Sequence, residues 1–403
     1  MKCVIVLACG LAEDPRESLG GKTPLDAART PVLDQMASRG ILGLTRTIPR
    51  GARLACETGG ASLLGYDPAL HPVRAAGLEA LGVGAHLGPR DVALRASLVT
   101  LDSNEDGTEI LGDPLGGRLP PSEGAELIDD LARAIGDDEI VLHAGLGHRH
   151  LLVWRDGDVE VRTTSPYELV DKPIAGRQPN GGRSDVLTRV MERARDVLAS
   201  HPVCAARRAR AERVPTALWP WDPSGAVSLP SVRDCFGLDG VVLAATPLGR
   251  GLGIAAGLTP LSVSGATADV DTNVAAEVEA VLASLATHDL AVLHLPAADL
   301  AAHSGDTQRK VTVIERLDEL CLGPLLEGLR RMGGDWRVLV AADHGTSCET
   351  RLHSAEPVPF CVCTERDESK PRGQKRGFSE RDAREQGIFI PEAYALLERL
   401  ARH

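Results

Sequence analysis

The stretch WRVLVAADHGTSCETRLHSAEPVPFCV, residues 336–362, begins and ends with an apolar run and is polar between them. The first run, 336–342, ends at Asp343 and His344, and the second, 358–363, follows a loop that contains His353. Short apolar runs of this kind are typical of buried strands. Because ligands bind beyond the carboxyl ends of strands in open α/β sheets, we expect these polar side chains to converge at one edge of a sheet.

Apolar runs recur along the rest of the chain and alternate with amphipathic helices. The other runs lie at 2–9, 41–47, 240–245 and 289–295. Long helices are expected near 271–286 and 307–331. Strands that alternate with helices are typical of a doubly wound, mostly parallel sheet covered on both faces. The fold class predicted for the chain is therefore α/β.

The middle of the chain has a different pattern, with strands joined by short turns and only two helices. The expected strands are 91–101, 139–144, 149–155 and 159–163, and the expected helices are 123–136 and 184–199. This pattern is typical of an α+β domain. We predict a smaller α+β domain at 76–224, inserted into a core domain formed by 1–75 and 225–403.

Composition excludes several classes of partner. The net charge of −12 repels phosphate backbones, and aromatic residues, the stacking platforms for bases, make up only 3% of the chain. We therefore expect no nucleic acid partner, and we expect no membrane span because no apolar run reaches about 18–20 residues. The start, MKCVIVLACG, is too short for a signal peptide, so a cytoplasmic location with free thiols is predicted. The oligomeric state stays open.

A second polar cluster follows the apolar run 289–295. Asp299 and His303 are four residues apart, so a helix places both on one face. Polar side chains also lie near the other predicted strands: Cys9 at the end of the first run, Asp343 and His344 after 336–342, and His353 in the loop before 358–363. Mixed carboxylate and imidazole ligands suit zinc or manganese. The pattern as a whole predicts a divalent metal site.

Several long segments resemble one known family. They are GGKTPLDAARTPVLDQMASRGILGL (20–44), ASLLGYDP (61–68), HRHLLVWRDG (148–157), ELVDKPI (168–174), GATADVDTN (265–273), AADLAAHSGD (297–306) and AADHGTSCETRLHSAEPVP (341–359). These segments are similar to the archaeal-type, cofactor-independent (2,3-bisphosphoglycerate-independent) phosphoglycerate mutases of the alkaline phosphatase superfamily. The resemblance implies an alkaline phosphatase-like core. It also implies interconversion of 3-phosphoglycerate and 2-phosphoglycerate, with no organic cofactor.

The resemblance also implies a mechanism with a phosphoserine and two divalent metals. One metal position would be formed by Asp299, His303 and His353, all of which are present. The other would include Asp343 and His344 together with an aspartate and the nucleophilic serine. At those last two places this chain has Cys9 and Cys56.

The two cysteines allow more than one interpretation. Thiolates of Cys9 and Cys56 could join Asp343 and His344 in a tetrahedral site that favours zinc over manganese, or Cys56 could be the nucleophile. The alternative is decay of the site, which would make the protein an inactive or regulatory metal-binding relative.

The expected substrate is a small phosphorylated acid such as phosphoglycerate. Candidate residues for binding it are Arg95, Arg149 and Lys172 in the inserted domain, and Arg250, which stands where the family has lysine. The family's GRGPLEA-like run reads RAAGLEA at 74–80. That departure leaves open a relative recruited to another phosphate or phosphonate substrate.

Overall fold

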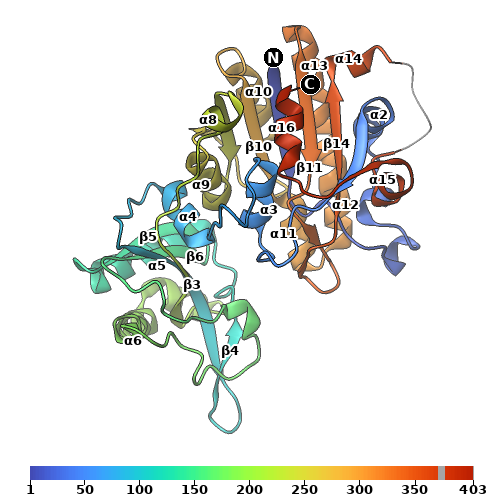
Figure 1. The fold of residues 1–403 in the computed structure, drawn as a ribbon. Helices are drawn as coiled ribbons and strands as arrows, with labels where there is room; N and C mark the ends of the chain where they lie inside the picture. Colours follow the sequence, from blue (N-terminus) through green and yellow to red (C-terminus); the bar gives the residue numbers. More distant parts are fainter. Residues whose placement is uncertain (371–376, 403) are drawn as a thin grey trace. The chain divides into compact units, whose positions relative to one another are not determined.

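The first apolar run of the chain forms strand β1 (Lys2–Ala8), a central strand of an eight-stranded sheet (Figure 1). The structure is a computed structural model that describes residues 1–370 and 377–402. These residues divide into two compact units, one formed by 1–73 and 228–403 and the other by 74–227. The range 76–224, expected to be an inserted domain, lies within the second unit. No helix in the described ranges is long and apolar enough to cross a lipid bilayer.

The sheet of the first unit is mostly parallel, as the alternation of strands and helices predicted. Its order is β15 (Ile388–Ile390), β2 (Ile41–Thr45), β14 (Val358–Thr364), β11 (Trp336–Ala341), β1, β10 (Leu290–Leu295), β8 (Gly240–Ala244) and β9 (Thr259–Leu261). Strand β1 is parallel to both β10 and β11, whereas β14 is antiparallel to β11 and to β2. The start of β14 therefore lies at the same edge of the sheet as the end of β11.

Helices cover both faces of this sheet. Side chains of α2 (Pro31–Arg39), α10 (Val274–Ser284), α12 (Thr307–Arg316) and α13 (Gly323–Met332) pack with Val4 and Val6 of β1 in one apolar core. A π-helical segment, Leu317–Leu322, joins α12 to α13. On the opposite face, Gly253 of α9 (Pro247–Ala255) lies against Val242 of β8. This two-sided burial explains the nearly continuous apolar strands.

The second unit is an α+β domain with a different strand set from the expected one. Its sheet has the order β4 (Glu109–Asp113), β3 (Val92–Ser103), β6 (Arg149–Trp154) and β5 (Ile140–Leu146), and β7 (Ala217–Ser224) also pairs with β3. The predicted strand at 159–163 is wrong, because only Arg162 forms a bridge there, to Asn180. Strands β4 and β7 were not predicted; β7 contains two prolines, which are disfavoured inside strands.

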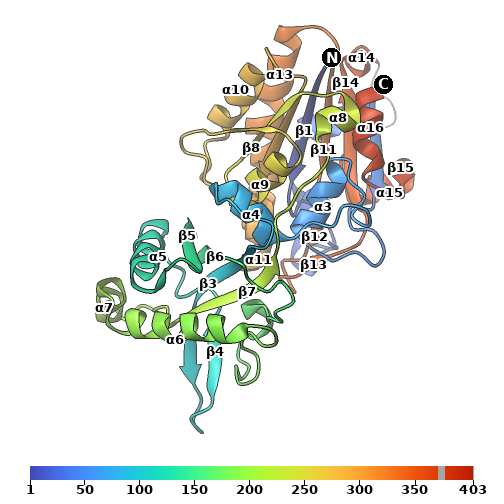
Figure 2. The same ribbon diagram turned by 60° about the vertical axis from the view of Figure 1, so that its left-hand side comes forward.

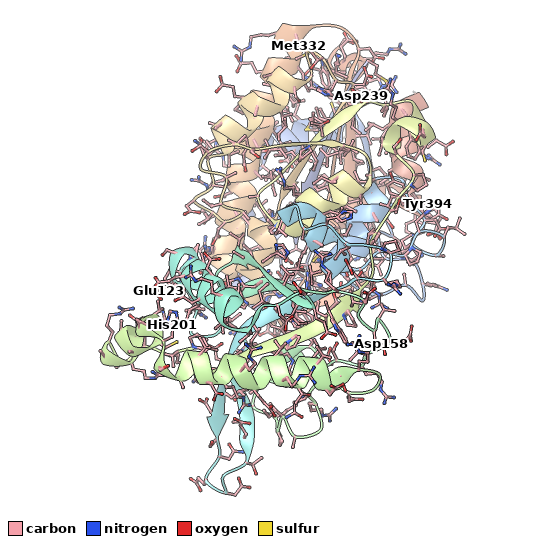
Figure 3. The ribbon with its side chains drawn as sticks, turned by 90° about the vertical axis from the view of Figure 1, so that its left-hand side faces the viewer. Glu123, Asp158, His201, Asp239, Met332 and Tyr394 are labelled. Atoms are coloured by element: carbon pink, nitrogen blue, oxygen red, sulfur yellow. The ribbon has the colours of Figure 1, made fainter. Side chains whose placement is uncertain are left out.

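Helices of the second unit are joined by ion pairs and hydrogen bonds. Figure 3 shows Glu123, in α5 (Pro121–Ile135), and His201, at the start of α7 (Pro202–Ala209). Glu123 accepts a 2.6 Å hydrogen bond from Arg207, and His201 lies 3.0 Å from Asp130. The basic residue Arg207 is therefore neutralised within its own unit.

A buried ion pair in the first unit leads to a stability prediction. Lys310 Nζ lies 2.8 Å from Glu13 Oε2, and both side chains are fully buried. Replacing Lys310 with methionine removes the nearer counter-charge of the Glu13 carboxylate and leaves Arg16 Nε, 3.6 Å from Glu13 Oε1, so we expect the free energy of unfolding to fall by about 3 kcal/mol, the low end for a broken buried pair. Urea denaturation measures this loss. The exposed pair Arg331–Glu327 provides the control, since Arg331→Gln should change stability by less than about 1 kcal/mol. An equal effect of both substitutions would contradict the prediction.

Candidate metal and catalytic site

Three elements and one loop of the first unit bring polar side chains to the same edge of the sheet. Cys9 follows β1, helix α11 (Ala297–Ser304) follows β10, and Asp343 and His344 follow β11. Because β14 runs in the opposite direction, the segment before it, with β13 (His353–Ser354), lies at this edge too. Figure 2 shows α11, β12 (Gly345–Thr346) and β13 together at this end of the sheet.

One group of potential metal ligands, here called the Asp299 group, consists of Asp299, His303 and His353. Their ligand atoms all lie within 4.8 Å of one another. The two Nε2 atoms of His303 and His353 are 2.9 Å apart, and Asp299 Oδ2 is 3.4 Å from His303 Nε2. The spacing of four residues on α11 and the turn before β14 thus bring two imidazoles and one carboxylate to a common point.

The ring of His303 is held in the orientation that a metal ligand needs. Its Nδ1 lies 2.9 Å from the backbone carbonyl oxygen of Arg351, which can only accept a hydrogen bond, so Nδ1 carries the proton. The lone pair of this tautomer is on Nε2, which lies 2.9 Å from His353 Nε2 and 3.4 Å from Asp299 Oδ2. A ring nitrogen bonded to a carbonyl is the usual support of a metal-binding histidine. Arg351 itself adopts the left-handed backbone conformation, with φ of 59°.

The electrostatics of the Asp299 group suit a divalent cation. Burial, together with the neighbouring His344, lowers the pKa of His353 to about 3, so its imidazole is neutral at physiological pH. Burial acts to raise the pKa of Asp299, but the hydrogen bond and charge of His303 more than offset it, and the pKa lies below its usual range. The donor set is therefore one carboxylate and two imidazoles, which fits zinc or manganese.

A second group, here called the Cys56 group, consists of Cys56, His344 and His353. Their ligand atoms also lie within 4.8 Å of one another. His344 Nε2 is 3.1 Å from Cys56 Sγ and 3.4 Å from Asp343 Oδ2. The rings of His344 and His353 are stacked, with centroids 3.8 Å apart. His353 is thus a member of both groups, whereas the sequence analysis assigned it to one metal position only.

Cys56 is the first residue of helix α3 (Cys56–Leu63), which packs closely against the end of β11. A Cβ atom at Gly59 would lie 2.0 Å from the carbonyl oxygen of Asp343, so only glycine permits this approach. The positive end of the α3 helix dipole lies at Cys56 and favours an anion on its sulfur. The position is therefore suited to a nucleophile or to a thiolate ligand.

Cys9 lies beside Asp343 and Cys56, as the sequence suggested, and also contacts a histidine that the sequence analysis did not include. Its Sγ lies 3.3 Å from His294 Nε2, and in the described part of the chain it belongs to neither three-residue group. Burial, followed by the charges of Asp343 and Cys56, raises the pKa of Cys9 well above its usual value, so its sulfur keeps its proton. The structure thus brings Cys56 and His344 together with Asp343 beside them, and it places Cys9 next to Asp343 with its sulfur against His294.

His294 was missed by the sequence analysis. It lies near the end of β10, is neutral because burial lowers its pKa, and has an Nδ1 atom without a hydrogen-bond partner among the described residues. The available signal was an ionisable residue in the otherwise apolar run LAVLHL.

Of the candidate substrate-binding residues, one lies in the first unit. Arg250, in α9, donates hydrogen bonds to the carbonyl oxygen of Leu261, at 3.3 Å, and to Ser262 Oγ, at 3.2 Å. Both acceptors are uncharged, so these two hydrogen bonds do not neutralise the positive charge of Arg250.

The other three candidates lie in the second unit. Arg95 forms a 2.7 Å ion pair with Glu79 and lies over the ring of Trp221, so much of its charge is already matched. Lys172 donates to a backbone carbonyl in its own loop, at 2.8 Å. Arg149 is exposed, and within the described ranges its guanidinium makes no hydrogen bond or ion pair. Arg149 is therefore the candidate whose donors are available to an anion.

Comparisons with known proteins point to one family. Residues 37–204 match the family model of 2,3-bisphosphoglycerate-independent phosphoglycerate mutases. Relatives bearing that name are 39% identical in Methanothrix thermoacetophila, over 90% of each chain, and 31% identical in Methanosarcina barkeri, over 98% of each chain. A solved structure from Pyrococcus horikoshii is similar in fold, with a TM-score of 0.79 and 24% identity over 99% of this chain and 96% of that one.

Proposed function

This chain belongs to the 2,3-bisphosphoglycerate-independent phosphoglycerate mutase family, and we propose that it is a metal-dependent isomerase that interconverts 3-phosphoglycerate and 2-phosphoglycerate. One observation carries the proposal. The Asp299 group lies directly beside the Cys56–His344 pair, with His353 bordering both. A cation-binding group next to a nucleophile is the arrangement that phosphoryl transfer requires.

In this proposal the two groups have separate roles. Asp299, His303 and His353 would hold one divalent ion, and Cys56, His344 and Asp343 would hold the second. When bound, such ions neutralise charge on the transferring phosphoryl oxygens. The carboxylate of Asp299 would supply the negative charge at the first position, and the imidazoles of His303 and His353 would supply nitrogen lone pairs.

Cys56 would be the nucleophile of the transfer. Its sulfur forms a bond to phosphorus while the bond between phosphorus and the substrate oxygen breaks, and the leaving oxygen takes a proton. The other hydroxyl of the bound glycerate then loses its proton and attacks phosphorus, which breaks the sulfur–phosphorus bond. Because a metal deprotonates a coordinating thiol, the thiol proton of Cys56 would leave to solvent when the ion binds, and His344 Nε2, 3.1 Å from the sulfur, would keep its lone pair for that ion.

The donor atoms suggest which metals the two positions prefer. Thiolate favours zinc over manganese, so we propose zinc for the position that includes Cys56. The Asp299 group contains only nitrogen and oxygen donors and suits either ion. Cys9, which keeps its proton beside His294, is not required as a ligand in this scheme.

The second unit would bind the acid substrate. Arg149 is proposed as its main anion-binding residue, because the guanidinium is exposed and can make a bidentate contact with carboxylate or phosphate. Arg95 would contribute less, since Glu79 already neutralises it. Lys172 and Arg250 are further candidates for binding the acid substrate.

The test is an exchange assay on the purified protein. We expect ³¹P nuclear magnetic resonance to show conversion of 3-phosphoglycerate to 2-phosphoglycerate by protein loaded with zinc and manganese. Removal of metal by a chelator should abolish conversion, and added metal should restore it. Fully loaded protein that exchanges no phosphoglycerate would contradict the proposed function.

A further inference from the structure

Thr346 lies between the two ligand groups and is almost completely buried, with 1% of its surface exposed. It belongs to strand β12, which pairs with β13 so that Thr346 is directly opposite His353. His353 is the residue that borders both groups. The backbone pairing therefore places the Thr346 side chain next to both candidate metal positions.

The hydroxyl of Thr346 contacts one ligand from each position. It donates a 2.6 Å hydrogen bond to Asp299 Oδ1, and its oxygen lies 3.1 Å from His344 Nδ1. A hydroxyl has one hydrogen, which here goes to the carboxylate, so His344 Nδ1 must be the donor of the second bond. The carbonyl oxygen of Gly345, 3.3 Å from the same nitrogen, requires the same direction.

The direction of the hydrogen bond from His344 Nδ1 to the Thr346 hydroxyl decides which nitrogen of His344 can bind a metal. With the proton on Nδ1, the lone pair is on Nε2, and Nε2 is the atom 3.1 Å from Cys56 Sγ. The same hydroxyl occupies Oδ1 of Asp299 and leaves Oδ2 beside His303 Nε2, at 3.4 Å. One side chain thus orients a ligand in each position.

The backbone of Thr346 is itself held on both sides. Its N–H donates to the carbonyl oxygen of Ala12, at 3.0 Å, and its carbonyl oxygen accepts from the buried Lys310 Nζ, at 2.7 Å. The hydroxyl therefore has little freedom to leave the two ligands.

We propose that Thr346 is a positioning residue on which the metal affinity of both positions depends. The inference rests on the proposed function only in so far as the two groups bind divalent metal. It does not depend on the identity of the substrate or of the nucleophile.

The experiment compares cobalt binding by metal-stripped wild-type protein, Thr346→Val and Thr346→Ser. Calorimetry reports the affinity of each position, and absorption by sulfur–cobalt charge transfer reports the position that contains Cys56. Valine keeps the shape but removes both hydrogen bonds, so we expect about 10–100-fold weaker binding at both positions. Serine keeps the hydroxyl and should bind within about threefold of wild type.

A matched control is available in the same unit. Thr45, in β2, is fully buried, and its hydroxyl has no hydrogen-bond partner among the described residues. Thr45→Val should leave cobalt binding and its absorption spectrum unchanged.

Three results would overturn the inference: wild-type affinity in Thr346→Val, weakening at only one position, or equal weakening in the serine and valine variants. Wild-type protein that takes up no cobalt would overturn the proposed function as well. Wild-type protein that binds two cobalt ions and exchanges phosphoglycerates, together with an unaffected Thr346→Val, would overturn this inference alone.

Discussion

Replacing Cys56 with alanine is expected to reduce phosphoglycerate exchange by at least about 1,000-fold, since removing the nucleophile of a covalent mechanism leaves only binding and electrostatic contributions. The sulfur occupies the first turn of α3 and lies 3.1 Å from His344 Nε2. The ³¹P exchange assay measures the loss. Mass spectrometry of wild-type protein quenched during turnover should in addition find one phosphoryl group on the peptide that contains Cys56.

Two further variants make this prediction specific. Cys56→Ser supplies the hydroxyl that the resemblance implies for the family, so it should retain measurable exchange while its preference shifts from zinc toward manganese. Cys235 is an exposed cysteine of the same unit, and Cys235→Ala should have wild-type activity. Full turnover by Cys56→Ala would show that its sulfur is not the nucleophile.

The second large effect is expected for Asp299→Asn. This change keeps the shape of the side chain but removes the only carboxylate of the Asp299 group, whose other members are imidazoles. Since a bound metal supplies several kcal/mol of charge stabilisation in the transition state, we expect turnover to fall by about 100-fold or more. Elemental analysis after dialysis should find the metal content reduced by one ion per chain.

Asp14, an exposed aspartate of the same unit, provides the matched control. Asp14→Asn should keep both the metal content and the turnover of the wild type. An Asp299→Asn variant with two metals per chain and normal turnover would show that the Asp299 group is not a metal position.

The local pattern of apolar residues was sufficient to predict much of the sheet of the first unit. Strands that are buried on both faces of the sheet are apolar along most of their length, so β1, β10 and β11 were predicted within a residue or two. The second unit was harder, because β7 contains prolines and its pairing with β3 depends on residues more than 100 positions away. The strand propensity of individual residues carries no information about such long-range pairing.

The sequence by itself determined the α/β class, the family resemblance, and the residue types available for a metal site. Its spacing of four between Asp299 and His303 also determined that these two share a helix face. These features follow from local periodicity and from motifs, which are written in consecutive residues.

Only the tertiary structure decided how those residues meet. The antiparallel direction of β14 brings His353 to the edge where β1, β10 and β11 end, and Cys9 turns toward His294 while Cys56 meets His344. The hydroxyl of Thr346 joins ligands from two different elements. Strand order, strand direction and side-chain contacts arise from packing between segments far apart in the chain, so no local pattern contains them.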